Sequence, residues 1–227
     1  SGSPAWVDPS SDRIEVDGRA VMRPKGSTRG GSKGGKGGRS EGKRERVYLA
    51  LHKPRGVVST NRDPEGRPTP LDLLKPAPAP GTRLFPVGRL DADSTGLLLL
   101  TNDGELAHRL THPRFGVTKR YLVRVAGAVA APDLDRLRQG LHLVDARKQG
   151  KAKPGVAGSP TRKAVVDDVR VLKRETDRQR GDRTTLSITL REGQNREIRR
   201  LLARLGFRVR RLKRVGIGPL ALKGLAA

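Results

Sequence analysis

Residues 87–104 read Val-Gly-Arg-Leu-Asp-Ala-Asp-Ser-Thr-Gly-Leu-Leu-Leu-Leu-Thr-Asn-Asp-Gly, and the fold can be worked out from this stretch outward. The four leucines are too few to cross a bilayer. They are bounded by glycine and by Asn-Asp-Gly, which predicts a buried strand that enters a turn. A polar loop before the strand carries Asp91 and Asp93, with Arg89 close by. Such a carboxylate suits covalent or acid–base chemistry, and the alternative is a loop with turn-forming aspartates.

The same stretch resembles the catalytic motif of an enzyme family. Gly88-Arg89-Leu90-Asp91, followed by Thr95–Gly104, is similar without a gap to the motif of the RsuA/RluB-type ribosomal RNA pseudouridine synthases. In that family the aspartate after Arg-Leu is catalytic, so the resemblance gives this role to Asp91. It gives Arg89 a supporting role in the active site and carries no role over to Asp93.

Two later stretches resemble the other motifs of this family, in the same order. Residues 117–125 alternate as a strand does, and Lys119-Arg120-Tyr121 is similar to a Lys-x-Tyr motif whose tyrosine lies against the target base. Glu192–Leu202 resembles the third motif, which would place Ile198 beside the base and pair Arg199 with the catalytic carboxylate. From the residues alone, the tyrosine is more simply interpreted as core or cross-strand packing, and arginines on such a helix usually face water.

The charge of the chain indicates a phosphate-rich partner. Lys and Arg number 48 against 23 Asp and Glu, a formal net charge of +25, so binding should weaken strongly with salt. Aromatic residues make up only 3% of the chain, so stacked rings are not expected to be the main device for binding RNA. We expect RNA to be contacted by Lys53, Lys119, Arg196 and Arg200.

Several classes of site and location are disfavoured by what the sequence lacks. There is no cysteine, which removes disulfides and thiol nucleophiles and fits a reducing cytoplasm. The four histidines show no His-Glu-x-x-His spacing, so no metal is expected, and the family resemblance implies no cofactor. No apolar run of membrane-spanning length and no signal peptide are found. We expect a cytoplasmic monomer that binds ribosomal RNA.

The chain divides into three parts by composition. Residues 1–23 hold a short hairpin pattern around Asp17-Gly18 and resemble the end of an S4-type RNA-binding domain. Residues 24–46 are rich in glycine and basic residues and are expected to be a flexible linker. Residues 47–227 are expected to form the catalytic domain. Its predicted elements are strands at 47–51, 56–60, 97–100, 117–125, 165–172 and 184–190, with helices at 105–110, 132–139 and 197–205.

The resemblance implies an α+β fold, a mixed and mostly antiparallel sheet with flanking helices. It also implies isomerisation of a flipped uridine to pseudouridine in ribosomal RNA, with the wording of the third motif nearest to the large-subunit branch. Whether Asp91 attacks C1′ of the ribose or C6 of the base stays open. The main alternative is a non-catalytic RNA-binding or ribosome-assembly protein, which the charge suits equally well. A nucleotide-binding enzyme is disfavoured because no phosphate loop follows a strand.

Overall fold

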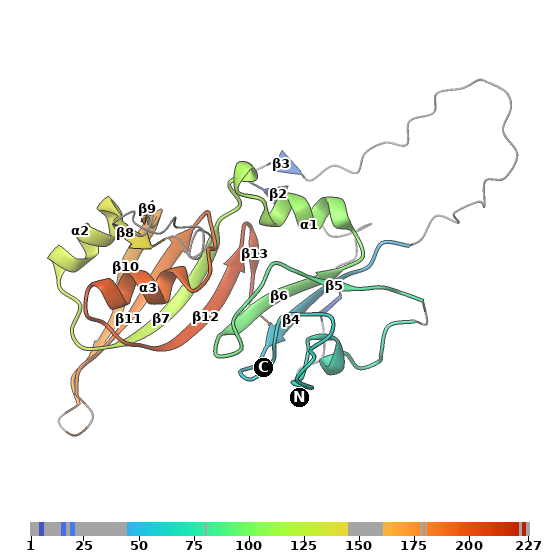
Figure 1. Ribbon diagram of the computed structural model, residues 1–227, viewed down its shortest axis with the longest axis horizontal. Coiled ribbons are helices and arrows are strands. Elements are labelled where there is room, and N and C mark those ends of the chain that lie inside the picture. The colour runs from blue at the N-terminus through green and yellow to red at the C-terminus, as the bar shows by residue number, and fades with distance from the viewer. Residues whose placement is uncertain are drawn as a thin grey trace, which may run out of the picture.

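A computed structural model (Figure 1) describes residues 45–225 except 80, 145–160, 178, 180 and 223, together with the backbone of three short strands nearer the N-terminus. Residues 24–44 of the predicted linker therefore lie outside the described residues. Within the described part of the chain, no helix is long and apolar enough to cross a membrane.

A nine-stranded sheet forms the body of the protein. Its strands follow the order β1 (Ala5–Trp6), β4 (Tyr48–Lys53), β6 (Thr95–Thr101), β12 (Val209–Ile217), β7 (Lys119–Ala126), β11 (Arg183–Leu190) and β10 (Asp168–Glu175), while β5 (Phe85–Val87) also pairs with β6 and β13 (Leu220–Ala221) with β12. The β6–β12 ladder is parallel, whereas the neighbouring ladders β4–β6 and β7–β12 are antiparallel. The sheet is thus mixed and mostly antiparallel, as predicted.

The remaining elements cover this sheet or connect its strands. They are the helices α1 (Gly104–Thr111), α2 (Ala131–Gln139) and α3 (Glu197–Arg204), the 3₁₀ turns η1 (Leu71–Leu73) and η2 (Pro113–Phe115), the ladder of β8 (Leu141–Val144) with β9 (Thr161–Ala164), and the ladder of β2 (Glu15–Val16) with β3 (Arg19–Ala20). In Figure 1, α2 and α3 lie over the half of the sheet formed by β7 and β10–β12, and α1 lies beside β5 and β6. The predicted α+β class is confirmed.

The leucine run forms β6, the strand predicted from it. All four leucines are buried, because apolar groups cover the strand on both sides. Leu97 and Leu99 pack in a cluster with Leu110 of α1, and Leu100 packs with Leu84 in another. Burial on both faces is why this strand reads as a continuous apolar run and not as an alternation.

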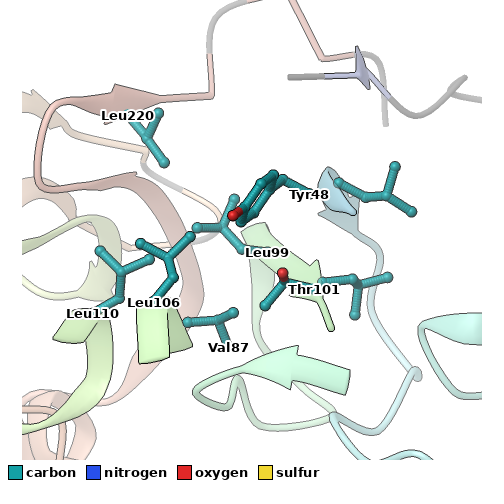
Figure 2. Close-up of a pocket in the computed structure, with 9 residues that line it drawn as sticks. Tyr48, Val87, Leu99, Thr101, Leu106, Leu110 and Leu220 are labelled. Carbon is teal, nitrogen blue, oxygen red and sulfur yellow. The ribbon is translucent and has the colours of Figure 1, made fainter. Parts of the chain in front are cut away.

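A small apolar pocket lies between α1 and the sheet. Figure 2 shows Leu106 and Leu110 of α1 on one side of it, with Val87 and Leu99 across from them. Its lining is apolar apart from the hydroxyl groups of Tyr48 and Thr101, so it offers no charged group for chemistry. The pocket reflects the packing of α1 on β5 and β6.

The two halves of the sheet meet where β6 begins. Only two residue pairs form the parallel ladder there, Lys213 with Thr95 and Arg214 with Gly96. The Arg214 side chain strengthens this junction because its Nε donates a 2.8 Å hydrogen bond to the carbonyl of Leu97. Glycine is required at position 96, where φ is +110° and a Cβ atom would lie 2.1 Å from the Arg214 carbonyl oxygen.

Gly96→Ala is expected to lower the free energy of unfolding by at least about 2 kcal/mol, because it adds both backbone strain and a clash with a neighbouring strand. Gly104→Ala is the matched control. Gly104 begins α1 and a Cβ there would meet nothing within 4 Å, so alanine should be neutral or stabilising. Urea denaturation of both variants measures the effect. Equal stability of the two variants would contradict the close approach at Gly96.

Two local predictions have clear outcomes. The hairpin around Asp17-Gly18 is confirmed by the ladder that sets Val16 opposite Arg19. The strand predicted at 56–60 is wrong, because these residues form turns and bends whose polar groups bond to the loop before β6. The pattern of small and β-branched residues resembles a strand, yet the segment has no neighbouring strand to pair with.

Candidate active site

The loop between β5 and β6 carries Asp91 and is held by the segment that follows β4. The Ser59 hydroxyl accepts a hydrogen bond from the Leu90 amide at 3.1 Å and donates one to the Leu90 carbonyl at 2.9 Å. The Gly56 amide donates to the Ala92 carbonyl at 2.7 Å. The main chain is thus fixed on both sides of Asp91, while its carboxylate stays partly exposed.

A buried lysine shapes this supporting segment. Lys53 is 0% exposed, and its ammonium donates to the carbonyls of Pro54 and Val57 at 2.9 and 2.7 Å. Burial lowers the pKa of Lys53 to about 8, although the charges of Asp91 and Asp93 act in the opposite direction. The prediction that Lys53 contacts RNA is therefore wrong, since its ammonium is buried and bonds to two carbonyls of the turn that supports the loop of Asp91.

Replacing Lys53 with Met is expected to change how stability depends on pH. The folded chain gives up the Lys53 proton near the lowered pKa of about 8, whereas the ordinary value is 10.5. Between these values the unfolded chain binds more protons, so rising pH removes part of the cost of the buried charge and stabilises the fold. Between about pH 7 and 9.5 the free energy of unfolding of the unchanged chain should rise by roughly 2 kcal/mol relative to that of Lys53→Met. Urea denaturation of both chains at the two pH values measures this. If the two free energies of unfolding differed by the same amount at both pH values, the pKa of Lys53 would not be lowered.

Two arginines at the start of α3 reach the aspartates across the junction of the half-sheets. Arg196 Nη1 lies 3.2 Å from Asp91 Oδ2, and Arg196 Nη2 lies 3.3 Å from Asp93 Oδ2. Arg199 Nη2 lies 3.1 Å from Asp93 Oδ2 and also faces the carbonyl of that residue. The ion pair predicted between Arg199 and Asp91 is therefore corrected: Arg196 contacts Asp91, and Arg199 contacts Asp93.

The backbone at Arg196 explains why Arg196, and not Arg199, contacts Asp91. Arg196 precedes α3 as its N-cap residue with φ 50° and ψ 31°, and it is the one non-glycine residue with positive φ in the described part of the chain. Its side chain is therefore not on the regular helical face that the sequence pattern assumes. Such left-handed geometry costs roughly 1–3 kcal/mol and concentrates at functional sites.

The electrostatics of this group keep Asp93 ionised. Partial burial raises the pKa of Asp93, but the hydrogen bond from Arg196 and the charges of Arg199 and Arg196 outweigh it, so the net pKa is below the ordinary value. Burial lowers the pKa of Arg199, against the charge of Asp93. The hydrogen bond to Asp93 raises the pKa of Arg196. Arg196 is thus a permanent cation between two carboxylates.

One buried cluster contains side chains that the sequence predicts at the site. Leu90, which precedes Asp91, belongs to the same buried cluster as Tyr121 and Ile198. Tyr121 stands opposite Arg214 in the β7–β12 ladder. Arg214 is 4% exposed, and its Nη2 is buried without a hydrogen-bond partner among the described residues. Sequence reasoning missed Arg214, and the only signal for it is a charged residue at an inward position of a strand.

The other predicted residues have different surroundings. Lys119, which is predicted to bind RNA, is buried, and its ammonium donates to the Arg191 carbonyl at 3.1 Å. Arg200 is half-buried and donates to the carbonyl of Val144. Arg89 is exposed and has no ion pair with any residue that the structure describes. In the same part of the chain, no group of three or more potential ligands could hold a metal ion.

Comparisons with known proteins assign the family. The model of the RNA pseudouridylate synthase family matches residues 47–204. An uncharacterized RNA pseudouridine synthase of Aquifex aeolicus is 38% identical over 97% of this chain and 71% of its own length. Ribosomal large subunit pseudouridine synthase B of Bacillus subtilis is 35% identical over 95% of this chain and 71% of its own length. The chain belongs to the RNA pseudouridine synthase family, whose members are isomerases, and the RsuA/RluB-type resemblance is confirmed.

A solved structure agrees with this assignment. The structure described as "Crystal structure of pseudouridylate synthase" is 29% identical, with a TM-score of 0.57 over 79% of this chain and 66% of that chain. A relative from Mycobacterium tuberculosis, an uncharacterized RNA pseudouridine synthase, is 45% identical over 78% of this chain but 61% of its own length. This chain thus spans about three fifths of that relative.

Proposed function

We propose that this chain isomerises a uridine of ribosomal RNA, in the large subunit, to pseudouridine. The observation that carries the proposal is the placement of Asp91. Its carboxylate is partly exposed and lies 3.2 Å from Arg196 Nη1, and hydrogen bonds hold the main chain on both sides of it. The preceding Leu90 belongs to the buried cluster that contains Tyr121 and Ile198. Relatives named ribosomal large subunit pseudouridine synthase B support large-subunit RNA as the substrate.

Asp91 acts as the nucleophile in this proposal. The target uridine leaves its stack, because an enzyme cannot reach the glycosidic bond inside a helix. An Asp91 oxygen then attacks either C1′ of the ribose or C6 of the base and forms a covalent adduct. In both routes the C1′–N1 bond breaks, the base turns, a C1′–C5 bond forms, and the bond to Asp91 breaks with its electron pair returning to the carboxylate. The electron pair of the former C5–H bond restores the ring as that proton leaves, and N1 takes up a proton in place of its bond to C1′, so atoms and electrons balance without an oxidant or cofactor.

The neighbouring side chains position the reactants. Arg196 orients the Asp91 carboxylate until the base arrives, while Arg199 holds Asp93 and with it the end of the loop. Tyr121 and Ile198 offer an apolar wall against which the flipped uracil can pack and turn. The distances of the arginine–aspartate ion pairs support the roles of Arg196 and Arg199.

Release of tritium from C5 tests the proposal. Ribosomal RNA labelled with tritium at uridine C5 must lose the label when the new carbon–carbon bond forms. We expect release from large-subunit RNA and none from small-subunit RNA. The competing function is a non-catalytic RNA-binding protein, which the charge of +25 suits equally well. RNA binding without release from either RNA would favour that function.

We further propose that residues 47–227 form the catalytic domain, with an S4-type remnant at 1–23 and a flexible linker at 24–46. A chain that begins at Glu45 is expected to isomerise saturating RNA at nearly the full rate and to bind RNA more weakly, because it lacks the basic linker. Single-turnover rates and a salt titration of binding compare the two chains. Loss of the single-turnover rate would show that β1, which pairs with β4, belongs to the catalytic domain.

A further inference from the structure

Three rings gather at the corner where α1 leads into η2. His108 and His112 lie with their ring centroids 5.0 Å apart, and Phe115 lies 5.6 Å from His108 and 6.2 Å from His112. The planes meet at 63°, 90° and 76°, so each pair is edge-to-face and no ring is sandwiched between the others. We call these three residues the ring cluster.

The ring cluster is unusual because the chain has so few rings. It has three phenylalanines, two tyrosines, one tryptophan and four histidines. Phe115 is half-buried and packs on the apolar cluster beneath α1, so protein packing accounts for it. His108 and His112 are exposed. His112 has a local task, since its Nδ1 accepts a hydrogen bond from the Arg114 amide at 3.2 Å. The side chain of His108 has no comparable bond within the part of the chain that the structure describes.

Positive charge surrounds the ring cluster. The Arg114 guanidinium lies over the Phe115 ring at 4.5 Å from its centroid. Arg114 is exposed and pairs with no carboxylate among the described residues. Arg109, by contrast, is held by Glu105 at 2.7 Å. Exposed rings beside an unpaired arginine are the combination with which proteins hold unpaired bases, since the rings stack on the base and the guanidinium attracts the backbone.

The ring cluster also lies next to the start of the catalytic loop. A Cβ atom at Gly88 would be 3.5 Å from Cγ2 of Thr111, the last residue of α1. Gly88 precedes Arg89, whose exposed side chain has no ion pair among the described residues. An RNA strand whose uridine lies at Asp91 and that continues toward α1 would therefore run from this loop to the ring cluster.

We propose that the ring cluster is a stacking site for an unpaired nucleobase of the RNA on one side of the flipped uridine. The site deepens the proposed function and rests on it. A flipped uridine leaves a gap in its stack, and a neighbouring base that loses its partner gains a new surface on His108 and His112. A metal ion is a poorer occupant, because two histidines are too few and the described residues offer no third ligand.

A double-mutant cycle that combines protein variants with RNA variants tests the site. The protein variants are His108→Ala and His108→Phe, and His142→Ala is the control, because His142 is an equally exposed histidine on β8, away from α1. The RNA is the large-subunit fragment that the chain binds most tightly in about 0.15 M salt. In a series of copies, each nucleotide near the bound uridine is made abasic in turn. Binding is measured in the Asp91→Asn background, so no turnover is needed.

His108→Ala should weaken binding of intact RNA by about 5- to 50-fold, in the range measured for loss of one base–ring stack. His108→Phe should restore most of this affinity, because it keeps a ring, and His142→Ala should change binding less than twofold. On one of the abasic RNAs the effect of His108→Ala should nearly vanish, since the stacking partner is already missing.

Three results would overturn the site. The first is an equal loss of RNA affinity in His108→Ala and His108→Phe. The second is a loss of affinity in His108→Ala that persists on every abasic RNA. The third is a fall in thermal stability of His108→Ala with no loss of affinity, which would assign the ring to protein packing. The proposed function fails separately. If the effect of His108→Ala vanishes on one abasic RNA but the unchanged chain never releases tritium, the stacking site is supported and the isomerase function is not.

Discussion

Asp91→Asn is expected to form no detectable pseudouridine while it binds RNA nearly as tightly as the unchanged chain. Asparagine has the same shape, but its amide cannot form the covalent bond that starts the reaction. Loss of a nucleophile typically costs at least about 10⁴-fold in turnover. The fold should survive, because the bonds that hold the loop run through the main chain of Leu90 and Ala92. Tritium release and filter binding measure the two properties.

Asp93→Asn is the matched control for this prediction. The Asp93 carboxylate lies between Arg196 and Arg199, so both of its charge partners hold it in a structural role. The Asp91 carboxylate has one such partner and keeps an oxygen available for attack. Asp93→Asn should therefore retain part of its turnover. If Asp91→Asn turned over and Asp93→Asn did not, the nucleophile would be Asp93.

The parts of the fold that sequence predicts are those with a local cause. The run at 97–100 is apolar because both faces of β6 are covered, and that pattern is visible without any neighbour. Helix α2 has a proline in its first turn and ends before Gly140, which are signals of helix boundaries. The alternation at 185–190 places every second side chain of β11 in the core. In each case the residue and its environment lie within one element.

The residues whose environment is predicted wrongly depend on contacts between distant segments. Lys53 reads as an exposed cation at the end of a strand, and it is buried because residues 54–60 fold back against the loop that carries Asp91. A local pattern cannot show this burial, since it contains no information on what packs above the side chain. Lys119 differs, because the alternation of β7 itself places it on the inward face of that strand. The contact of its ammonium with the carbonyl of Arg191 is the part that the pattern does not contain.

The wrong prediction of which arginine pairs with Asp91 has a different cause. The resemblance to the family's third motif assigns the ion pair with the catalytic carboxylate to Arg199. The left-handed backbone at Arg196, one residue before α3 begins, lets the Arg196 side chain contact Asp91 instead. Asn and Gly favour this conformation and arginine does not, so no preference in the sequence indicates it. The conformation becomes visible only with the ion pairs that it allows.

Arg196→Gly is expected to separate stability from catalysis. Glycine adopts a φ of 50° at little cost, so removing the strained arginine should leave the free energy of unfolding unchanged or raise it by up to about 1 kcal/mol. Turnover should nevertheless fall by about 10²- to 10³-fold, the range for loss of one preorganised electrostatic partner. The cause is the loss of the guanidinium that contacts Asp91 and bridges it to Asp93. Single-turnover rates and urea denaturation give the two numbers.

Arg199→Ala and Arg200→Ala complete the comparison. Arg199 is largely buried and bonds to Asp93 and to the carbonyl of Val209, so its loss should lower stability and turnover together. Arg200 donates to the Val144 carbonyl and to neither aspartate among its described contacts, so its loss should leave turnover within a few-fold of the unchanged chain. The opposite ranking, with Arg196→Gly active and Arg199→Ala inactive, would mean that Arg199 takes over the contact with Asp91 once RNA is bound.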